Sequence, residues 1–216
     1  MLSILILQNI ENELKKRLVY PYTWGKKQNN GDDRLTNFIY DINSFEKLLS
    51  EIDIRFKNKP NYNYLFNYAL NRWYNYWSAR AVESIFCSLP NVIPAKDEKD
   101  RLVDFSIRGI NFDHKTSVFP RKYPRNYDYA KQHSKDLCEW LYKNQSQEGR
   151  KHLKNRLFIV LFSKDGKHWK LKSEISVLKE KIEFYVNNFN NRKLIEIKFT
   201  DESIALTDII WVENYI

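Results

Sequence analysis

A run of apolar residues at 155–162, with the sequence NRLFIVLF, has the length of a single β-strand. Successive side chains of a strand point to opposite sides, so a continuous apolar run predicts a strand that is buried on both faces. Helical patterns flank this run in the chain, over 126–148 and 172–188. The sequence therefore predicts an α/β protein in which a sheet lies between helical layers.

The other elements follow a simple order along the chain. A long amphipathic helix is predicted over 61–89, where apolar and aromatic residues recur at helical spacing. Three short strands come next, and two more close the chain. The expected strands lie at 91–95, 102–107, 111–118, 193–199 and 207–213. We expect residues 61–216 to form one α/β domain and residues 1–60 to be a helical and loop extension packed on it.

Aromatic residues are concentrated in the predicted helix at 61–89. Aromatic side chains at this density can stack on nucleic-acid bases. Their helical period, seen at Phe66, Trp73 and Trp77, is more typical of residues that pack in a core. We therefore expect most of these side chains to be buried.

Positive charge is concentrated in one part of the sequence. The chain has a net charge of +9, and the segment 121–172 contains 14 Lys and Arg against 5 Asp and Glu. A concentrated basic region is typical of proteins that bind an anionic partner, most often nucleic acid. A solvated lysine-rich surface gives the same pattern, so charge alone leaves both interpretations open.

Several protein classes are disfavoured by the sequence. The apolar opening, MLSILILQNI, is too short to span a bilayer and has no signal-peptide pattern, so no membrane association is expected. Cys87 and Cys138 are too few for a disulfide framework, and the four histidines show no zinc-site spacing. These features favour a cytoplasmic protein with reduced cysteines.

The segment VDFSIRGINFDHKTSVF, which surrounds Gly109, has the pattern of a β-hairpin. Residues alternate across each strand, so Asp104 lies on the polar side of the first strand, and Asp113 and Lys115 lie on the polar side of the second. A two-residue loop at Arg108 and Gly109 would place Asp104 opposite Asp113. A loop shifted by one residue would instead place Asp104 opposite Lys115.

Either register brings two carboxylates and an ammonium group together. Facing carboxylates that leave room for water and a phosphate suit Mg²⁺ or Mn²⁺. Lys115 would then be placed to stabilise charge on a phosphate, or to orient or activate the attacking water. The simpler alternative is a cross-strand ion pair between Asp104 and Lys115, with Asp113 facing solvent.

These residues resemble the motif of the PD-(D/E)xK superfamily, the restriction-endonuclease-like nucleases. VD at 103–104 matches the acidic residue of the second core strand, and DHK at 113–115 matches the (D/E)xK of the third, although Val103 stands where the family name has a proline. The resemblance covers residues 62–163 and implies an αβββαβ core with a central mixed sheet flanked by helices. It also implies a nuclease, dependent on Mg²⁺ or Mn²⁺, that hydrolyses phosphodiester bonds of DNA by in-line attack of a metal-activated water.

The resemblance implies a further acidic residue. Glu83, on the helix predicted before the strands, matches a family glutamate that acts as a metal ligand or supports the ligands, here together with Asp104 and Asp113. An ion pair with Arg80, three residues away on the same helix, is the alternative. His114 has the opposite strand parity, so we expect it in the core rather than in catalysis.

In this superfamily the segments after the third strand often approach DNA. The side chains expected to contact phosphates are Arg121, Lys122, Arg125, Gln132, Arg150 and Lys151. Ordinary surface placement is the alternative for each of them. The resemblance also makes a homodimer plausible, because many relatives dimerise to cut two strands.

Two other functional classes remain open. One is a non-catalytic nucleic-acid-binding or assembly protein that keeps this fold, and the presence of Asp104, Asp113 and Lys115 together argues against it. The other is a different metal-dependent phosphotransfer or nucleotide chemistry, although the five glycines form no phosphate-binding loop motif. The sequence favours the nuclease and leaves its substrate structure, DNA or RNA preference and recognition sequence open.

Overall fold

The structure is a computed structural model that describes residues 4–24, 28–96, 103–144, 154–200 and 202–214. The chain forms two compact units. The helical unit comprises Leu2–Val82 with Lys172–Ser176, and the sheet unit comprises Glu83–Leu171 with Val177–Ile216. The predicted boundary at residue 60 remains a prediction.

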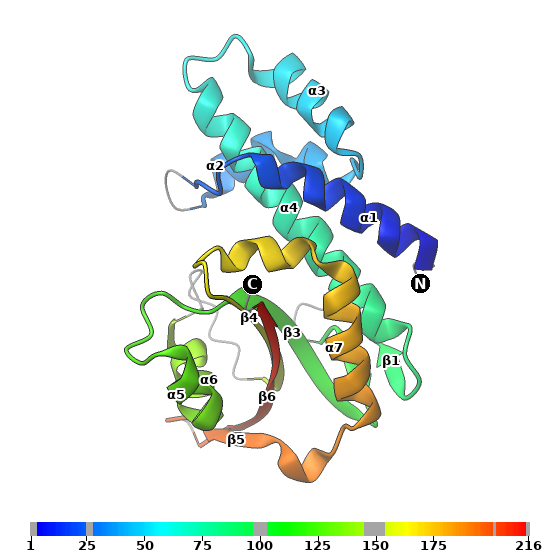
Figure 1. Cartoon of the computed structure of the whole chain (residues 1–216), viewed down its shortest axis with the longest axis vertical. Coiled ribbons are helices and arrows are strands. Elements are labelled where there is room, and N and C mark those ends of the chain that lie inside the picture. The colour runs from blue at the N-terminus through cyan, green and yellow to red at the C-terminus, as the bar shows by residue number, and fades with distance from the viewer. Residues whose placement is uncertain (1–3, 25–27, 97–102, 145–153, 201, 215–216) are drawn as a thin grey trace. The chain divides into compact units, whose positions relative to one another are not determined.

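The helical unit holds the N-terminal helices (Figure 1). Its elements are α1 (Ile4–Lys16), η1 (Arg17–Val19), α2 (Asn30–Leu35), η2 (Asn37–Tyr40), α3 (Phe45–Phe56) and the first part of α4 (Tyr62–Cys87). Tyr68, Trp73 and Tyr74 of α4 are completely buried, which confirms that dense aromatic residues of this helix serve as core. α4 has 26 residues, yet no helix in the described ranges is long and apolar enough to cross a bilayer.

The sheet unit contains a six-stranded sheet in the described part of the chain. Its strands are β1 (Val92–Pro94), β2 (Phe105–Ile107), β3 (Ile110–Val118), β4 (Arg156–Ser163), β5 (Ile195–Lys198) and β6 (Ile204–Asn214). Across the sheet they lie in the order β1-β2-β3-β4-β6-β5. β1, β2 and β3 pair antiparallel, β4 pairs parallel with β3 and β6, and β5 pairs antiparallel with β6. A mixed sheet with helices, following an N-terminal helical region, confirms the predicted α/β class.

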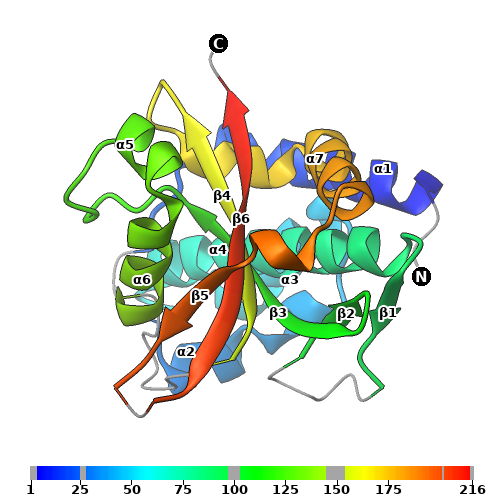
Figure 2. The ribbon, with the colours of Figure 1, turned by 90° about the horizontal axis from the view of Figure 1, so that it is seen from below.

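Helices cover both faces of this sheet (Figure 2). α5 (Tyr127–Gln132) and α6 (Ser134–Asn144) lie on one face, and α7 (Ile175–Asn187) lies on the other. The five consecutive residues 157–161 of β4 are all buried. β4 is therefore the strand that the sequence predicts to be buried on both sides, and helices cover it on each face.

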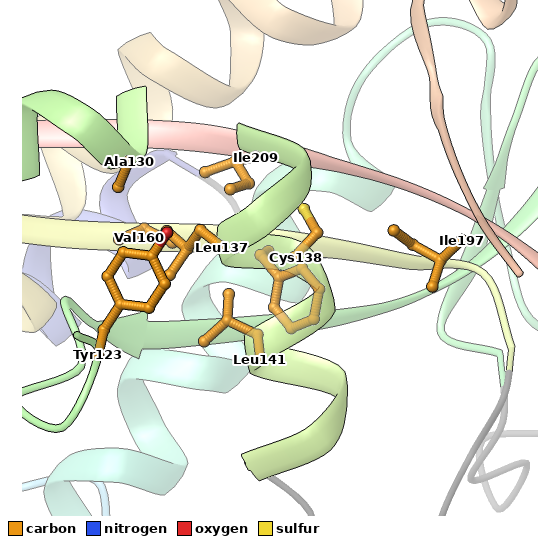
Figure 3. Close-up of a cluster of buried hydrophobic side chains, with 9 residues drawn as sticks. Tyr123, Ala130, Leu137, Cys138, Leu141, Val160, Ile197 and Ile209 are labelled. Carbon is orange, nitrogen blue, oxygen red and sulfur yellow. The ribbon is translucent and has the colours of Figure 1, made fainter. Parts of the chain in front are cut away.

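A cluster of buried apolar side chains joins α5 and α6 to the sheet (Figure 3). From α6, Leu137, Cys138 and Leu141 lie on the side of the helix that faces the strands. The other members of the cluster are Tyr123, Ala130, Phe158, Val160, Ile197 and Ile209. Burial of this apolar surface holds both helices in place and leaves their opposite sides to solvent.

Two predicted helices differ from the observed ones. The helix expected over 126–148 is two helices, because His133 has a ψ of 54°, which ends α5 before α6 begins. The helix expected over 172–188 begins later than predicted, because residues 172–173 belong to the 3₁₀ helix η3 (His168–Ser173) and α7 begins at Ile175. A further 3₁₀ helix, η4 (Asn191–Lys193), follows α7. Residues 145–148 lie outside the described ranges. The order of one helix, three strands, a helical segment and a strand is the predicted one.

The turn between β2 and β3 is the two-residue loop considered from the sequence. Arg108 and Gly109 both have positive φ, 48° and 86°. A type I′ turn requires positive φ at both central positions. Ile107 pairs with Ile110 across this turn, so the register shifted by one residue is not the one that forms.

Candidate active site

The hairpin brings Asp104 close to Asp113. Phe105 pairs with Phe112, and Asp104 precedes this pair on one strand while Asp113 follows it on the other. The amide of Asp104 donates to the carbonyl of Phe112 at 2.9 Å, so Asp104 and Phe105 both lie across from Phe112 and the regular pairing ends there. The two carboxyl groups interact directly, since each alters the pKa of the other. The structure thus brings together the two aspartates that the sequence singled out.

Asp104 is held by His114. Oδ2 of Asp104 accepts a hydrogen bond from the His114 amide at 2.7 Å and lies 2.7 Å from His114 Nδ1. The imidazole is 8% exposed and stacks on the ring of Phe105, with 5.9 Å between ring centroids. His114 therefore has the predicted core position, and it also fixes the orientation of one carboxylate of the candidate site.

Asp113 is held by Arg156. The guanidinium donates from Nε at 2.6 Å and from Nη2 at 2.5 Å, both to Oδ2 of Asp113. The parallel register pairs Asp113 directly with Arg156, the first residue of β4. The guanidinium also lies over the rings of Tyr142 and Phe158, 5.8 Å and 5.9 Å from their centroids. Arg156 is 12% exposed, so this charge is largely removed from water.

Arg156 is not among the residues that the sequence assigned to the site. The sequence feature that could have identified Arg156 is its position at the start of a strand that is otherwise apolar and buried on both faces. A charged side chain in such a position needs a partner of opposite charge. The identity of that partner depends on the parallel register of β3 and β4, which the sequence does not specify.

The pKa values of the two carboxyl groups are shifted in opposite directions by these surroundings. Burial raises the pKa of Asp104, but the hydrogen bond and charge of His114 outweigh burial and hold that pKa below its ordinary value. Burial also raises the pKa of Asp113. Although the Arg156 charge opposes burial, the neighbouring Asp104 charge adds to it, and the pKa of Asp113 stays above its ordinary value. Two carboxylates with pKa values pushed apart are typical of functional sites.

The pKa of His114 shifts in the direction opposite to the one that burial alone would cause. Burial alone would lower the pKa of the imidazole, since a charged ring is poorly solvated there. The hydrogen bond with Asp104, and the negative charges of Asp104, Asp113 and Glu83, raise the pKa above its ordinary value instead. The raised pKa of His114 thus has its physical cause in the hydrogen bond and negative charge of the neighbouring carboxylates.

Lys115 and Glu83 occupy different surroundings. Lys115 lies two residues after Asp113 on β3, so it projects from the same side of the strand, and it is exposed. Glu83 lies in α4, is partly buried, and acts electrostatically on His114. The catalytic role of Lys115 and the metal-ligand role of Glu83 remain predictions.

The donor chemistry of the two aspartates fits one divalent cation. The hydrogen bonds from His114 and Arg156 fall on the Oδ2 atoms, so each carboxylate keeps acceptor capacity at its other oxygen. Mg²⁺ binds through one or two carboxylates and fills its remaining positions with water and phosphate oxygens. Among the described residues, no three His, Cys, Asp or Glu side chains are grouped to hold a metal. The geometry therefore offers the aspartate pair, with substrate and water needed to complete the coordination.

The residues predicted to contact nucleic acid lie after β3. Arg121 and Lys122 are exposed in the turn that follows the strand, and Arg125 and Gln132 are exposed at the two ends of α5. The remaining two, Arg150 and Lys151, lie outside the described residues. The four described side chains are accessible to a large anionic partner, and their contacts with it remain predictions.

Comparisons of this chain with protein-family models, with curated proteins and with solved structures each give no match.

Proposed function

We propose that this protein is a metal-dependent nuclease of the PD-(D/E)xK type that hydrolyses phosphodiester bonds of DNA. The proposal is supported by the proximity of the Asp104 and Asp113 carboxyl groups at one hairpin, with Lys115 following Asp113 on the same side of β3. The order of a helix, three strands, a helical segment and a parallel fourth strand supports a restriction-endonuclease-like core around it.

Each residue has a distinct role in this proposal. Asp104 and Asp113 would hold a Mg²⁺ or Mn²⁺ ion, which stabilises negative charge on a phosphate and lowers the pKa of water. Lys115 places a positive charge beside the phosphate oxygens, where negative charge grows during in-line attack. His114 and Arg156 position the two carboxylates through their hydrogen bonds.

Nucleic acid as the substrate is supported by charge. The segment 121–172 carries most of the excess of basic residues, and its described cations Arg121, Lys122 and Arg125 are exposed. α5 and α6 follow the strand that carries Asp113, and Arg156 lies over Tyr142 of α6, so the basic helices and the carboxylates share one side of the sheet. A polyanion bound to these helices would thus approach the candidate site.

A second candidate function is a non-catalytic nucleic-acid-binding protein that keeps this fold. One observation favours it: Arg156 already gives Asp113 a cationic partner, through two hydrogen bonds to one oxygen. In this alternative the Asp113–Arg156 pair joins β3 to β4, and the carboxylates need no metal. The two functions differ in whether a divalent cation binds at Asp113.

A cleavage assay tests the nuclease directly. Supercoiled DNA, linear duplex, single-stranded DNA and RNA would each be incubated with the protein and Mg²⁺ or Mn²⁺. We expect Asp113→Asn and Lys115→Ala to reduce cleavage by about 100-fold or more, because each removes charge that acts on the transition state. Asp41→Asn and Lys193→Ala, which change exposed residues outside the hairpin, serve as matched controls and should retain activity.

A metal titration separates the two functions independently of the substrate. Under the nuclease proposal, Mn²⁺ raises the midpoint temperature of wild-type unfolding in a concentration-dependent manner, as any ligand of the folded state does. The increase should vanish in Asp113→Asn and persist in Asp41→Asn. Cleavage absent with every substrate, together with no response of the wild type to Mn²⁺, would reject the nuclease in favour of the binding protein.

A further inference from the structure

Three side chains of different types form a continuous stack on the outer side of α5. The ring of His133 is nearly parallel to that of Tyr129, with an interplanar angle of 12° and 4.1 Å between centroids. The guanidinium of Arg125 lies over the Tyr129 ring, 5.3 Å from its centroid. Tyr129 lies within α5, Arg125 precedes its N-cap residue Asn126, and His133 is its C-cap residue, so the contacts join the two ends of the helix across one side of it.

The stack is fixed in place by hydrogen bonds. The Tyr129 hydroxyl donates to Oδ2 of Asp136 at 2.9 Å. His133 Nδ1 lies 3.0 Å from the Tyr129 carbonyl, and because a carbonyl only accepts, this nitrogen carries the proton. The side chain of Asn126 caps α5 by accepting from the Tyr129 amide at 2.9 Å. The Tyr129 and His133 rings are thus held in their orientation by the protein itself.

This stack is not part of the hydrophobic core. Tyr127 and Ala130 are the buried residues of α5 and hold the helix against the sheet, whereas Arg125 and His133 are exposed and Tyr129 is partly exposed. Exposed planar groups in a preformed stack present flat surface to solvent. Such a surface suits a partner that itself carries flat, unpaired rings.

The surroundings of the stack are basic. The segment from Arg121 to Asp136 contains five Lys and Arg and two acidic residues, Asp128 and Asp136, the second of which accepts the Tyr129 hydroxyl. Lys131 is engaged with Glu213 at 2.5 Å, while Arg121, Lys122 and Lys135 are exposed. A flat stack bordered by cations combines the two features that bind single strands: stacking surface for bases and positive charge for phosphates.

We propose that Arg125, Tyr129 and His133 form a stacking platform for unpaired nucleotides of a single-stranded nucleic acid. Paired bases in a duplex already stack on one another, so their faces are not accessible to a protein surface, whereas unpaired bases can stack on aromatic rings and guanidinium planes. As a statement about substrate, this inference rests on the proposed nuclease function. It assigns to the enzyme a substrate with a single-stranded segment.

Binding measurements without metal test the platform apart from cleavage. Fluorescence anisotropy in EDTA would follow a labelled oligothymidylate about 16 nucleotides long, near the largest site of a single-strand-binding module. An abasic strand of the same length carries the same phosphates and lacks the bases. We expect wild-type protein to bind the oligothymidylate about tenfold more tightly than the abasic strand, and more tightly than a duplex of the same length.

Substitutions of the stack should remove this preference for bases. Tyr129→Ala and His133→Ala are each expected to weaken oligothymidylate binding about tenfold and to leave abasic binding nearly unchanged. Tyr129→Phe keeps the ring and should retain the preference. Lys135→Ala, the charge control, should weaken both strands equally and lower the salt dependence of binding.

The outcomes separate this inference from the proposed function. Equal wild-type affinity for both strands, stronger binding of the duplex, or unchanged binding by His133→Ala would overturn the platform. If these results appeared while Asp113→Asn still abolished metal-dependent cleavage, the nuclease would stand and its substrate would not require unpaired bases. If the platform were supported and no cleavage occurred with any substrate, the chain would be a single-strand-binding protein.

Discussion

The hairpin and the face of the sheet covered by α7 provide buried carboxylates with different hydrogen-bond donors. At the hairpin, Asp104 and Asp113 each receive hydrogen bonds from a basic side chain, His114 and Arg156. On the face covered by α7, Asp208 accepts from the Tyr185 hydroxyl at 3.1 Å and from the Ile209 amide at 2.8 Å, both uncharged donors. Burial raises the pKa of Asp208, and these hydrogen bonds do not reverse the shift.

The difference shows what maintains charge at the hairpin. Burial raises the pKa of all three aspartates, and only at Asp104 does a partner lower it below the ordinary value. A buried carboxylate keeps a low pKa only where its partners outweigh burial, which His114 does for Asp104 and Arg156 does not do for Asp113. At the hairpin, Asp104 is therefore the carboxylate that favours its ionised form, which is the form that binds a cation.

The largest effect is expected from removing the guanidinium at the hairpin. Arg156→Met leaves Asp113 beside Asp104 without its cation, so the free energy of unfolding at neutral pH should fall by about 3 kcal/mol. Urea denaturation of the metal-free protein measures this change. The double variant Arg156→Met with Asp113→Asn should recover most of the loss, whereas an unaffected single variant would show that Arg156 does not balance the pair.

A smaller loss of folding stability is expected when the charge of Asp104 is removed by substitution. Because the pKa of Asp104 lies below its ordinary value, its charge stabilises the fold above that ordinary value, and this stability is lost as the pH falls through the lowered pKa. Asp104→Asn should therefore lower the free energy of unfolding by about 2 kcal/mol at neutral pH. The difference between variant and wild type should disappear in acid, and a gain in stability at neutral pH would contradict the role of His114.

An Asp→Asn substitution on the other face, at Asp208, should change the free energy of unfolding in the opposite direction. The pKa of Asp208 lies above its ordinary value, so ionised Asp208 destabilises the fold, and wild-type stability falls as the pH rises through the two values. Asp208→Asn should raise the free energy of unfolding by about 1 kcal/mol at neutral pH and have little effect in strong acid. Denaturation at several pH values checks the sign, and a loss at neutral pH would remove the contrast between the faces.

Local patterns in the sequence predict much of this arrangement. Alternation along 103–118 and the glycine at 109 are sufficient to predict the hairpin, a two-residue turn and a polar side that carries both aspartates, although they leave two registers open. The apolar run at 155–162 predicts the strand that is covered on both faces. Each of these features depends on residues that are close in the chain, where side-chain period and turn chemistry determine the structure.

Features that depend on distant parts of the chain are harder to predict. The pairing of Asp113 with Arg156 follows from a parallel register set by the packing of α5 and α6, and the apolar pattern of β4 tolerates other registers. The break at His133 arises because α5 and α6 each pack on the sheet, while the sequence over 126–148 has an uninterrupted helical pattern. The contacts of Glu83 also depend on tertiary packing, so local sequence patterns do not predict them.

The separation of Asp113 from Arg156 along the chain also has a consequence for folding. Asp104 and His114 are 10 positions apart, whereas Asp113 and Arg156 are 43 apart. Short loops close more readily than long ones, so the hairpin can form well before β4 docks beside it. During that interval the two carboxylates lie close together without the guanidinium, and their like charges repel. Docking of β4 then relieves this repulsion, so completion of the sheet and neutralisation of the hairpin are one and the same folding event.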